Sequence, residues 1–359
     1  MGAVLGEKPS VVVVGAGAIG LSLTGWLFPH VESLHLLARG NSLVELKASG
    51  LQLCHVGQGT KTYSVNVIAS LDDIDHPDII VLTVKNYDIE AAAKMLRQQL
   101  GDEEPILVSL QNGIENQRII PRYFSRSLFG VVCYNAWREG SSVVKFVKPG
   151  HVVIGALTDG RTSDLQSVAS VLSLGLRCDI TDCLQDAVHC KLAINLINGL
   201  MALVGFRKRS IESEKILVHM TTRLLAEGVE VVQTAGFKEQ DLGSMPSWKD
   251  IELAVDMPES PENPLYDFII NRVGPTSMTQ DVYSGKPNTE LESLNGYMLE
   301  LARRVGVSTP INQAIYEIAK ERLHPRFTPI EEDVLWEMIS NRILGWFYAS
   351  NRGLTRRLT

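Results

Sequence analysis

Residues 11–20 read VVVVGAGAIG, a run of valines followed at once by a glycine-rich turn. A short, wholly apolar run of this kind is typical of a strand buried on both faces of a sheet. The turn has G-x-G-x-x-G spacing, and residues 19–28 continue it with the composition of a helix. A strand, a glycine turn and a helix in this order predict the start of a dinucleotide-binding α/β fold.

Each glycine of the turn has its own physical reason. Gly15 allows the tight turn, Gly17 lets a pyrophosphate approach the backbone, and Gly20 lets the helix pack closely on the strand. The first turn of the helix offers backbone N–H groups and the positive end of its dipole. We therefore expect the phosphates of a dinucleotide at this turn, and the alternative is a glycine turn without a ligand. The residues expected there are Gly15, Ala16, Gly17, Ala18, Ile19 and Gly20.

The first half of the chain continues with apolar runs separated by helical stretches, which predicts a doubly wound parallel sheet covered on both faces. We expect strands at residues 10–15, 33–38, 63–68, 79–84, 106–110, 129–133 and 152–154. We expect helices at residues 19–28, 43–49, 89–100, 116–123 and 162–174.

The second half is different in character and predicts a mostly α-helical domain. Helical apolar periodicity covers residues 186–204, 216–235, 289–305, 311–323 and 331–344, and residues 246–264 form a loop or two short helices. A length of 359 residues also fits about two domains. We expect a Rossmann-type NADP-binding domain at residues 1–182 and a helical substrate and catalytic domain at residues 183–359.

The composition excludes several classes of protein. Lys and Arg total 34 and Asp and Glu total 41, giving a net charge of −7 with no basic stripe, so nucleic acid is not an expected partner. No apolar run approaches the roughly 18 residues of a membrane span, so we expect no membrane association. Five cysteines without a Cys-x-x-Cys pair and eight scattered histidines indicate neither a disulfide framework nor a metal site. A reducing cytoplasm is the expected location, although an organelle is not excluded.

The residue after the second expected strand indicates the cofactor. NAD-binding versions of this fold usually carry an acid roughly 20 residues beyond the glycines, where it binds the ribose hydroxyls. Here Arg39 stands nineteen residues after Gly20. A guanidinium pairs with a 2′-phosphate, so we expect NADP(H), and the alternative is a solvated surface arginine.

Two further strand ends are expected to lie at the same edge of the sheet. Lys85 follows the strand at residues 79–84, and Asn112 follows the strand at residues 106–110. Ligands of doubly wound sheets bind outside the carboxyl ends of the strands. Both residues are therefore placed to reach the cofactor or the substrate.

Three polar residues interrupt an apolar helical stretch in the second half. Lys191, Asn195 and Asn198 are spaced by four and then three positions, which places them on one face of a helix. An ammonium and two amides are costly to bury without partners. They therefore either form a structural network with other protein groups or line a polar cleft.

Several motifs, in order along most of the chain, resemble those of the ketopantoate reductases (2-dehydropantoate 2-reductases). The shared motifs are GAGAIG, VKNY at residues 84–87, LQNG at residues 110–113, and Lys191-Leu192 followed by asparagines. The most specific part is TSMTQDVYSGKPNTELESLNGY at residues 276–297, followed by GVSTPIN at residues 306–312.

The resemblance implies NADPH-dependent reduction of 2-dehydropantoate to (R)-pantoate, a step toward pantothenate and coenzyme A. It implies that Lys191 is the catalytic proton donor and that Glu290 is the acid at the junction of cofactor and substrate. The resemblance further implies substrate contacts at Asn112, Asn195, Asn198 and Ser277. It also implies cofactor contacts at Arg39, Lys85, Asn112 and Glu290 in addition to the glycine turn.

Two departures from the family pattern leave the substrate open. The two asparagines are three residues apart rather than four, and Pro287-Asn288 makes the stretch before Glu290 one residue longer, with Asn288 or Thr289 near a helix N-cap. One alternative is a reductase of the same fold that acts on another 2-oxo acid. The other is a regulatory protein that binds NADPH without turnover. A homodimer is possible in either case.

Overall fold

A computed structural model describes residues 8–257, 260, 262–286, 288–324 and 327–355. The chain divides into two compact units. Unit 1 comprises Met1–Val188 with Leu242–Ser244, and unit 2 comprises His189–Asp241 with Met245–Thr359. The division falls inside helix α6 (Leu184–Asn195), and each unit is described by itself.

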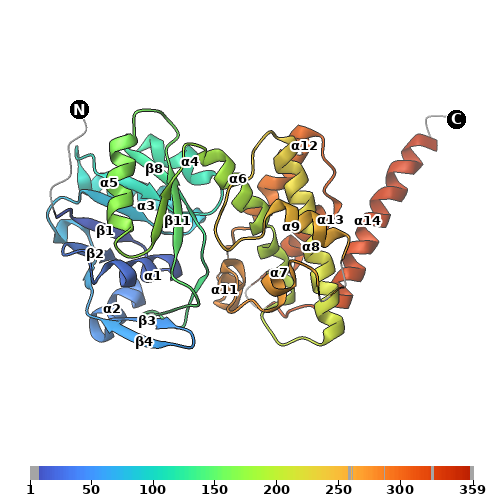
Figure 1. Cartoon of the computed structure of the whole chain (residues 1–359), viewed down its shortest axis with the longest axis horizontal. Helices are drawn as coiled ribbons and strands as arrows, with labels where there is room; N and C mark the ends of the chain where they lie inside the picture. The colour runs from blue at the N-terminus through green and yellow to red at the C-terminus, as the bar shows by residue number, and fades with distance from the viewer. Residues whose placement is uncertain (1–7, 258–259, 261, 287, 325–326, 356–359) are drawn as a thin grey trace. The chain divides into compact units, whose positions relative to one another are not determined.

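Unit 1 is built on an eight-stranded sheet in the order β12-β11-β8-β7-β6-β1-β2-β5 (Figure 1). Strand β1 is the valine run, and all of its residues are buried because β2 and β6 flank it in parallel. The strands are β1 (Val11–Val14), β2 (Leu34–Leu37), β5 (Asn66–Ile68), β6 (Ile79–Leu82), β7 (Ile106–Ser109), β8 (Ser127–Val132), β11 (His151–Gly155) and β12 (Arg177–Ile180). This arrangement confirms the predicted Rossmann-type fold.

One pair of strands corrects the expectation of a wholly parallel sheet. β8 and β11 are antiparallel, with Val131 opposite Val153. The chain between them forms β9 (Ala136–Arg138) and β10 (Val143–Phe146) instead of a helix. A parallel connection needs a long crossover, usually a helix, so its absence here permits the reversed direction.

A second, four-stranded sheet in the order β4-β3-β10-β9 was not predicted. It contains β3 (Leu51–His55) and β4 (Gly59–Tyr63) in addition to β9 and β10. The single strand expected at residues 63–68 was therefore wrong, because its two ends belong to different sheets. Tyr63 closes β4 in the small sheet, and residues 66–68 form β5 in the large one.

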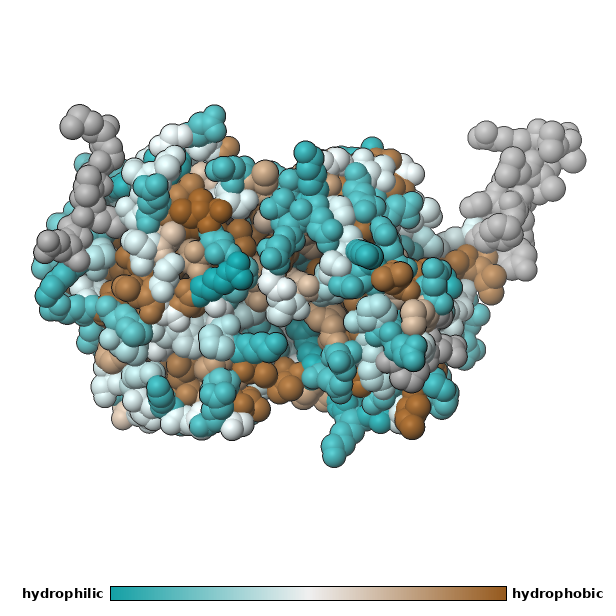
Figure 2. All heavy atoms as spheres, viewed as in Figure 1, coloured by the Kyte–Doolittle hydropathy of each residue, from teal (hydrophilic) through white to brown (hydrophobic). Residues whose placement is uncertain are grey.

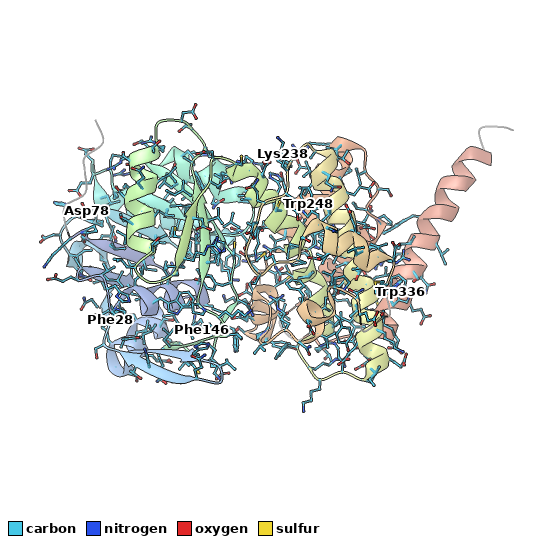
Figure 3. All side chains as sticks on the ribbon, viewed as in Figure 1. Phe28, Asp78, Phe146, Lys238, Trp248 and Trp336 are labelled. Carbon is cyan, nitrogen blue, oxygen red and sulfur yellow. The ribbon has the colours of Figure 1, made fainter. Side chains whose placement is uncertain are left out.

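The small sheet explains why the first helix is apolar on every side. α1 (Ala18–Leu27) packs on β1 and β2 with one face and on β3, β9 and β10 with the other. Trp26 makes edge contacts with Phe146 of β10 and with Tyr134, at ring-centroid distances of 5.1 and 5.0 Å. Phe146 is labelled in Figure 3. A helix enclosed by two sheets is expected to be hydrophobic all round. Residues 18–27 are mostly apolar, and the hydroxyls of the buried Ser22 and Thr24 donate to backbone carbonyls of the same helix.

The other helices of unit 1 lie close to their expected positions. They are α2 (Gly40–Ser49), α3 (Ile89–Leu100), α4 (Glu115–Ile119) and α5 (Thr162–Leu172), with short 3-10 turns at Leu71–Asp73, Asn86–Asp88 and Ile120–Arg122.

Unit 2 is helical, as predicted, and its long helix α8 (Ile211–Thr234) contacts most of the others (Figure 1). Trp336 of α14, labelled in Figure 3, packs edge-on against His219 of α8. The remaining helices are α7 (Ile197–Val204), α9 (Trp248–Val255), α10 (Tyr266–Ile270), α11 (Ser277–Tyr283), α12 (Tyr297–Val305), α13 (Pro310–Arg322) and α14 (Glu332–Thr355).

The single helix expected at residues 186–204 is interrupted in the structure, so this expectation was wrong. α6 ends at Asn195 and α7 begins at Ile197, with a turn at Leu196 between them. Lys191 and Asn195 therefore belong to one helix and Asn198 to the next. The backbone of Leu196 itself keeps helical torsion angles, with φ of −55° and ψ of −30°.

The same segment corrects the expectation about apolar runs. By length and composition alone, Leu184–Val204 could cross a membrane, with a mean hydropathy of 1.5 over its most apolar 18 residues. In the structure 94 % of that window is buried, as in the core helix of a globular domain, so this is weak evidence for a span. Figure 2 shows hydrophilic and hydrophobic residues interspersed on the visible face of each unit.

The helix expected at residues 289–305 begins with a π-helical turn. The turn covers Glu292–Gly296 and runs directly into α12. The hydroxyl of Thr289 accepts a hydrogen bond from the backbone N–H of Leu291 at 3.4 Å, which fits the expected N-cap. Pro287 lies outside the described residues.

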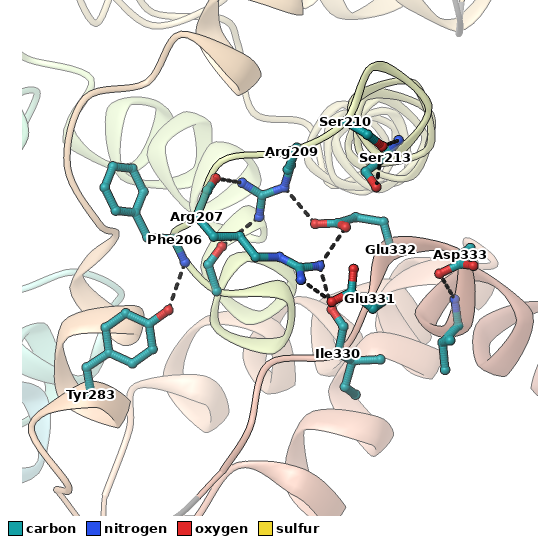
Figure 4. A network of polar contacts seen from close by, with 12 residues as sticks. Phe206, Arg207, Arg209, Ser210, Ser213, Tyr283, Ile330, Glu331, Glu332 and Asp333 are labelled. Atoms are coloured by element: carbon teal, nitrogen blue, oxygen red, sulfur yellow. Dashed lines mark hydrogen bonds and ion pairs between the residues drawn. The ribbon is translucent and has the colours of Figure 1, made fainter.

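A polar network joins the chain after α7 to the start of α14 (Figure 4). Glu332 is fully buried and accepts hydrogen bonds from Arg207 at 2.7 Å and from Arg209 at 2.6 Å. Arg207 also pairs with the exposed Glu331. The network fixes the position of α14 on unit 2.

Candidate functional site

The glycine turn has the geometry that the sequence predicts. Gly15 has a φ of +110°, a conformation that disfavours every residue with a side chain. The hydroxyl of Thr83 donates to the carbonyl oxygens of Val14 at 2.9 Å and Gly15 at 3.0 Å, which holds the turn from the neighbouring strand end. Thr83 is a supporting residue that the sequence reasoning did not single out.

The fold needs two of the three glycines for its own packing but not the third. A Cβ atom on Gly20 would lie 1.9 Å from the carbonyl oxygen of Gly15, and one on Gly15 would lie 3.1 Å from Val84. A Cβ on Gly17 would meet nothing nearer than the carbonyl of Thr83 at 4.0 Å, and its φ of −78° suits any residue. Space left open at Gly17 fits the close approach of a pyrophosphate.

The N-terminus of α1 is also suited to an anion. Gly17 is its N-cap residue, no side chain caps the helix, and its first turn holds no acid. The first N–H groups of a helix lack intrahelical acceptors and carry the positive end of the dipole. The turn can therefore hold the phosphates of a dinucleotide.

Four neighbouring strands bring the other expected cofactor residues to one edge of the sheet. In the order β7-β6-β1-β2, their carboxyl ends lead to Asn112, Lys85, the glycine turn and Arg39. The side chain of Asn86 donates to the backbone carbonyl of Asn112 at 2.7 Å, which ties the ends of β6 and β7 together. Because these strands are parallel, the grouping follows from the fold.

Arg39 lies at the surface of this edge. It is the N-cap residue of α2, and its side chain is 76 % exposed. Its guanidinium is 3.7 Å from the carboxylate of Asp88, a loose and solvated pair. The side chain is therefore accessible to a phosphate.

Unit 2 carries the expected catalytic lysine and asparagines. Lys191 lies on α6, and its Nζ contacts the sulfur of Met245 at 3.5 Å. Asn195 is the last residue of α6 and Asn198 is the second residue of α7, and both are buried. Leu196 alone separates the two helices at this point.

Ser277 and Glu290 meet in the same unit. Ser277 is the first residue of α11, whose N-cap Thr276 accepts a bond from the N–H of Thr279. The Ser277 hydroxyl donates to the Glu290 carboxylate at 3.4 Å, and Glu290 is only 3 % exposed. Two residues thirteen positions apart in the sequence motif thus form one hydroxyl–carboxylate pair.

Arg272 is a residue that the sequence reasoning missed. It stands five positions before Ser277, and its Nε is buried without a hydrogen-bond partner among the described residues. Burial lowers the pKa of its guanidinium to about 10, with no carboxylate acting against that shift. A desolvated cation without a counter-charge suits an anionic ligand. The only sequence signal was an arginine just before the TSM motif.

The described residues contain no group of three or more His, Cys, Asp or Glu placed to hold a metal ion. Unit 1 holds the glycine turn, Arg39, Lys85 and Asn112. Unit 2 holds Lys191, Asn195, Asn198, Ser277 and Glu290.

Comparison with known proteins matches family models to both halves of the chain. The model described as "Ketopantoate reductase PanE/ApbA" matches residues 11–159, and "Ketopantoate reductase PanE/ApbA C terminal" matches residues 184–323. A curated 2-dehydropantoate 2-reductase of Pyrococcus horikoshii is 27 % identical over 316 residues, covering 87 % of this chain and 97 % of the relative. The enzyme of that name from Archaeoglobus fulgidus is 28 % identical and covers 86 % of this chain and 96 % of its own.

Solved structures share the fold at lower identity. A ternary complex of D-mandelate dehydrogenase with NADH and anilino(oxo)acetate has a TM-score of 0.70 at 20 % identity, covering 91 % of this chain and 99 % of that one. A PanE/ApbA family ketopantoate reductase from Ralstonia eutropha has a TM-score of 0.67 at 22 % identity, with the same coverage.

Proposed function

The chain belongs to the ketopantoate reductase family and is an oxidoreductase, and from this premise we propose that it reduces 2-dehydropantoate to (R)-pantoate with NADPH. The named relatives are nearly fully covered, so both of their parts are represented here. The observation that carries the proposal is the Ser277–Glu290 contact. It joins two residues of the sequence motif that is most specific to the family.

The dinucleotide is assigned to the glycine turn, Arg39 and Lys85. The turn fits phosphates because Gly17 leaves open space where another residue would place a Cβ. Arg39 offers an exposed guanidinium to a 2′-phosphate, whereas an acid at this position would repel it. When bound, NADPH supplies the hydride for the reduction.

The protein must supply a proton and stabilise the charge that grows on the substrate carbonyl oxygen. Lys191 is assigned both tasks, because an ammonium group donates a proton and attracts an oxyanion. Glu290 is assigned to orient the reacting groups through the bond with Ser277, whose hydroxyl is also a substrate contact. Asn112, Asn195 and Asn198 are assigned to orient the substrate through amide hydrogen bonds without adding charge.

Arg272 adds a candidate for the anionic end of the substrate. A 2-oxo acid carries a carboxylate, and a guanidinium binds a carboxylate with two parallel hydrogen bonds. The buried Nε and the absence of a described carboxylate partner support this assignment.

A second candidate substrate is another 2-oxo acid. The interruption at Leu196 falls between Asn195 and Asn198, the two amides whose spacing departs from the family pattern. An assay of NADPH oxidation with a panel of 2-oxo acids distinguishes the two candidate substrates. The assay measures the loss of the near-ultraviolet absorbance of NADPH. A clear preference for 2-dehydropantoate supports the first candidate, preference for another acid supports the second, and no turnover with any acid contradicts both.

The cofactor assignment has its own test. Arg39→Asp should shift the ratio of kcat/KM values for NADPH and NADH toward NADH, since it replaces attraction for the 2′-phosphate by repulsion. An unchanged ratio would remove Arg39 from this role.

A further inference from the structure

The break between α6 and α7 is held from outside by a buried amide. The side chain of Asn295, in the π-helical turn, donates to the backbone carbonyl of Leu196 at 3.2 Å. Asn295 is fully buried. Leu196 is the residue that separates Asn195 on α6 from Asn198 on α7. A donor from a distant part of the sequence is therefore fixed to the point where the two helices meet.

A second buried asparagine fixes the first. The Nδ2 group of Asn295 also donates to the side-chain oxygen of Asn312 at 2.9 Å, and the Asn312 amide donates back to the backbone carbonyl of Asn295 at 3.3 Å. Asn312 is fully buried as well. This reciprocal pair leaves the Asn295 amide little freedom to rotate, so its bond to Leu196 is well directed.

The carboxylate of Glu227 on α8 anchors the second asparagine in turn. It accepts hydrogen bonds from the backbone N–H groups of Ile311 and Asn312, both at 2.8 Å. These groups lie in the first turn of α13, where a carboxylate compensates the unpaired donors and the helix dipole. α8, α13, the π-helical turn and the break are thus connected in one series.

Gly199 leaves the space that this arrangement needs. A Cβ atom on Gly199 would lie 2.9 Å from the side-chain oxygen of Asn295. Gly199 has an ordinary helical position in α7, so its lack of a side chain is explained by the neighbouring amide.

We propose that Asn295 and Asn312, anchored by Glu227, are positioning residues that set the direction of Asn198 relative to Lys191 and Asn195. They act through the Leu196 carbonyl and do not themselves contact substrate or cofactor. This inference rests on the proposed function for the roles of Lys191 and the two amides. It gives a role to residues 294–296 (LNG) and 309–312 (TPIN), which have no role in the catalytic assignments.

The test compares two buried asparagines of unit 2. Asn295→Ala removes the bond to Leu196, whereas the control Asn263→Ala removes bonds to the carbonyls of Ala254 and Met257, away from the break. Asn263 is 4 % exposed, so both variants lose a buried amide. We expect kcat for the 2-oxo acid to fall about tenfold to a hundredfold in Asn295→Ala, with its KM raised and the Kd of NADPH unchanged. Asn263→Ala should keep the kinetic constants of the wild type at temperatures where it is folded.

A milder variant keeps the test valid if Asn295→Ala does not fold. Gly199→Ala displaces the Asn295 amide by a few tenths of an ångström and should show the same pattern in kcat and KM with a smaller loss. Wild-type kinetics in whichever of the two variants folds, or equal losses in the Asn263→Ala control, would overturn the proposal.

Hydrogen exchange separates this proposal from the proposed function. The backbone amides of residues 196–200 should exchange faster in Asn295→Ala or Gly199→Ala than in Asn263→Ala, whether or not any 2-oxo acid is turned over. Unchanged exchange in these amides would refute the anchoring of the break. Turnover by the wild-type chain alone decides the proposed function.

Discussion

A Cβ atom on Gly20 would lie 1.9 Å from the carbonyl oxygen of Gly15. The turn and the helix that follows it can therefore pack this closely only because Gly20 has no side chain. Gly17, between them, is under no such constraint. We therefore expect Gly20→Ala to fail to fold or to unfold at much lower temperature. Gly17→Ala should keep the thermal midpoint of the wild type but lose NADPH affinity, measured by calorimetry. Full affinity in Gly17→Ala would contradict a phosphate at this position.

Lys191 is predicted to act in the chemical step. Lys191→Ala should lower kcat by about 10² to 10⁴, the usual contribution of a general acid, because the proton donor and the charge opposite the oxyanion are both lost. The variant should still bind NADPH, as measured by the quenching of protein fluorescence. Lys191→Arg is the matched control for charge, since it keeps a cation but donates a proton poorly. Near-normal turnover in the alanine variant would exclude Lys191 from this role.

Arg272 is predicted to bind the substrate carboxylate. Arg272→Gln should raise the KM of the 2-oxo acid at least tenfold and leave the Kd of NADPH unchanged. It should also raise the free energy of unfolding, because it removes a partly buried cation whose Nε has no described hydrogen-bond partner. If the Kd of NADPH rises instead, Arg272 binds a phosphate. Lower stability with unchanged KM would make it a structural residue.

Glu227 makes stability depend on pH. Burial raises the pKa of its carboxyl group from 4.5 to about 7, although the N–H bonds from Asn312 and Ile311 act in the opposite direction. Glu230 and Arg223, both on α8, are the charged groups that bear on it. Between these two pKa values the folded state binds more protons than the unfolded state. The free energy of unfolding should therefore fall as pH rises through this window, by at most about 1.4 kcal/mol per pH unit.

Urea unfolding on either side of that window measures the effect. Glu227→Gln should remove this part of the pH dependence of stability. The control Glu252→Gln, at an exposed carboxylate, should leave the pH dependence unchanged. An unaltered pH dependence in Glu227→Gln would show that the carboxyl group titrates normally.

The buried Glu332 should matter far more than its neighbour Glu331 (Figure 4). Glu332→Ala leaves Arg207 and Arg209 without their buried partner and should lower the free energy of unfolding by about 3–5 kcal/mol. The side chain of Glu331 is 61 % exposed, so Glu331→Ala should cost no more than about 1 kcal/mol. Equal effects in the two variants would mean that the network does not anchor α14.

The central strands could be predicted because each is an apolar run that ends near a glycine or a polar cluster. The small sheet could not. β4 reads GTKTY and is almost wholly exposed, so it has no hydrophobic pattern, and β3 pairs with β10 across some ninety residues. The antiparallel pairing of β8 with β11 follows from the missing helix between them, a signal that the sequence did contain.

The individual site residues remain predictions, although motifs and fold agree on where each should lie. The break at Leu196 had no local signal, since neither glycine nor proline stands at that position. Asn295, a donor about a hundred residues away, binds the Leu196 carbonyl at this point, and no local pattern predicts that contact. Arg272 and Glu227 were missed for a related reason. Their importance depends on what surrounds them in space.

The π-helical turn at Glu292–Gly296 has a consequence for how this protein tolerates changes in length. Removing one residue there would restore the ordinary winding of the helix and turn everything before it by about 100° about the axis. Glu290 would then point away from Ser277, and Asn295 away from Leu196. An insertion ahead of Thr289 leaves that phase intact, so the protein should tolerate a longer loop there but not a residue lost from the turn.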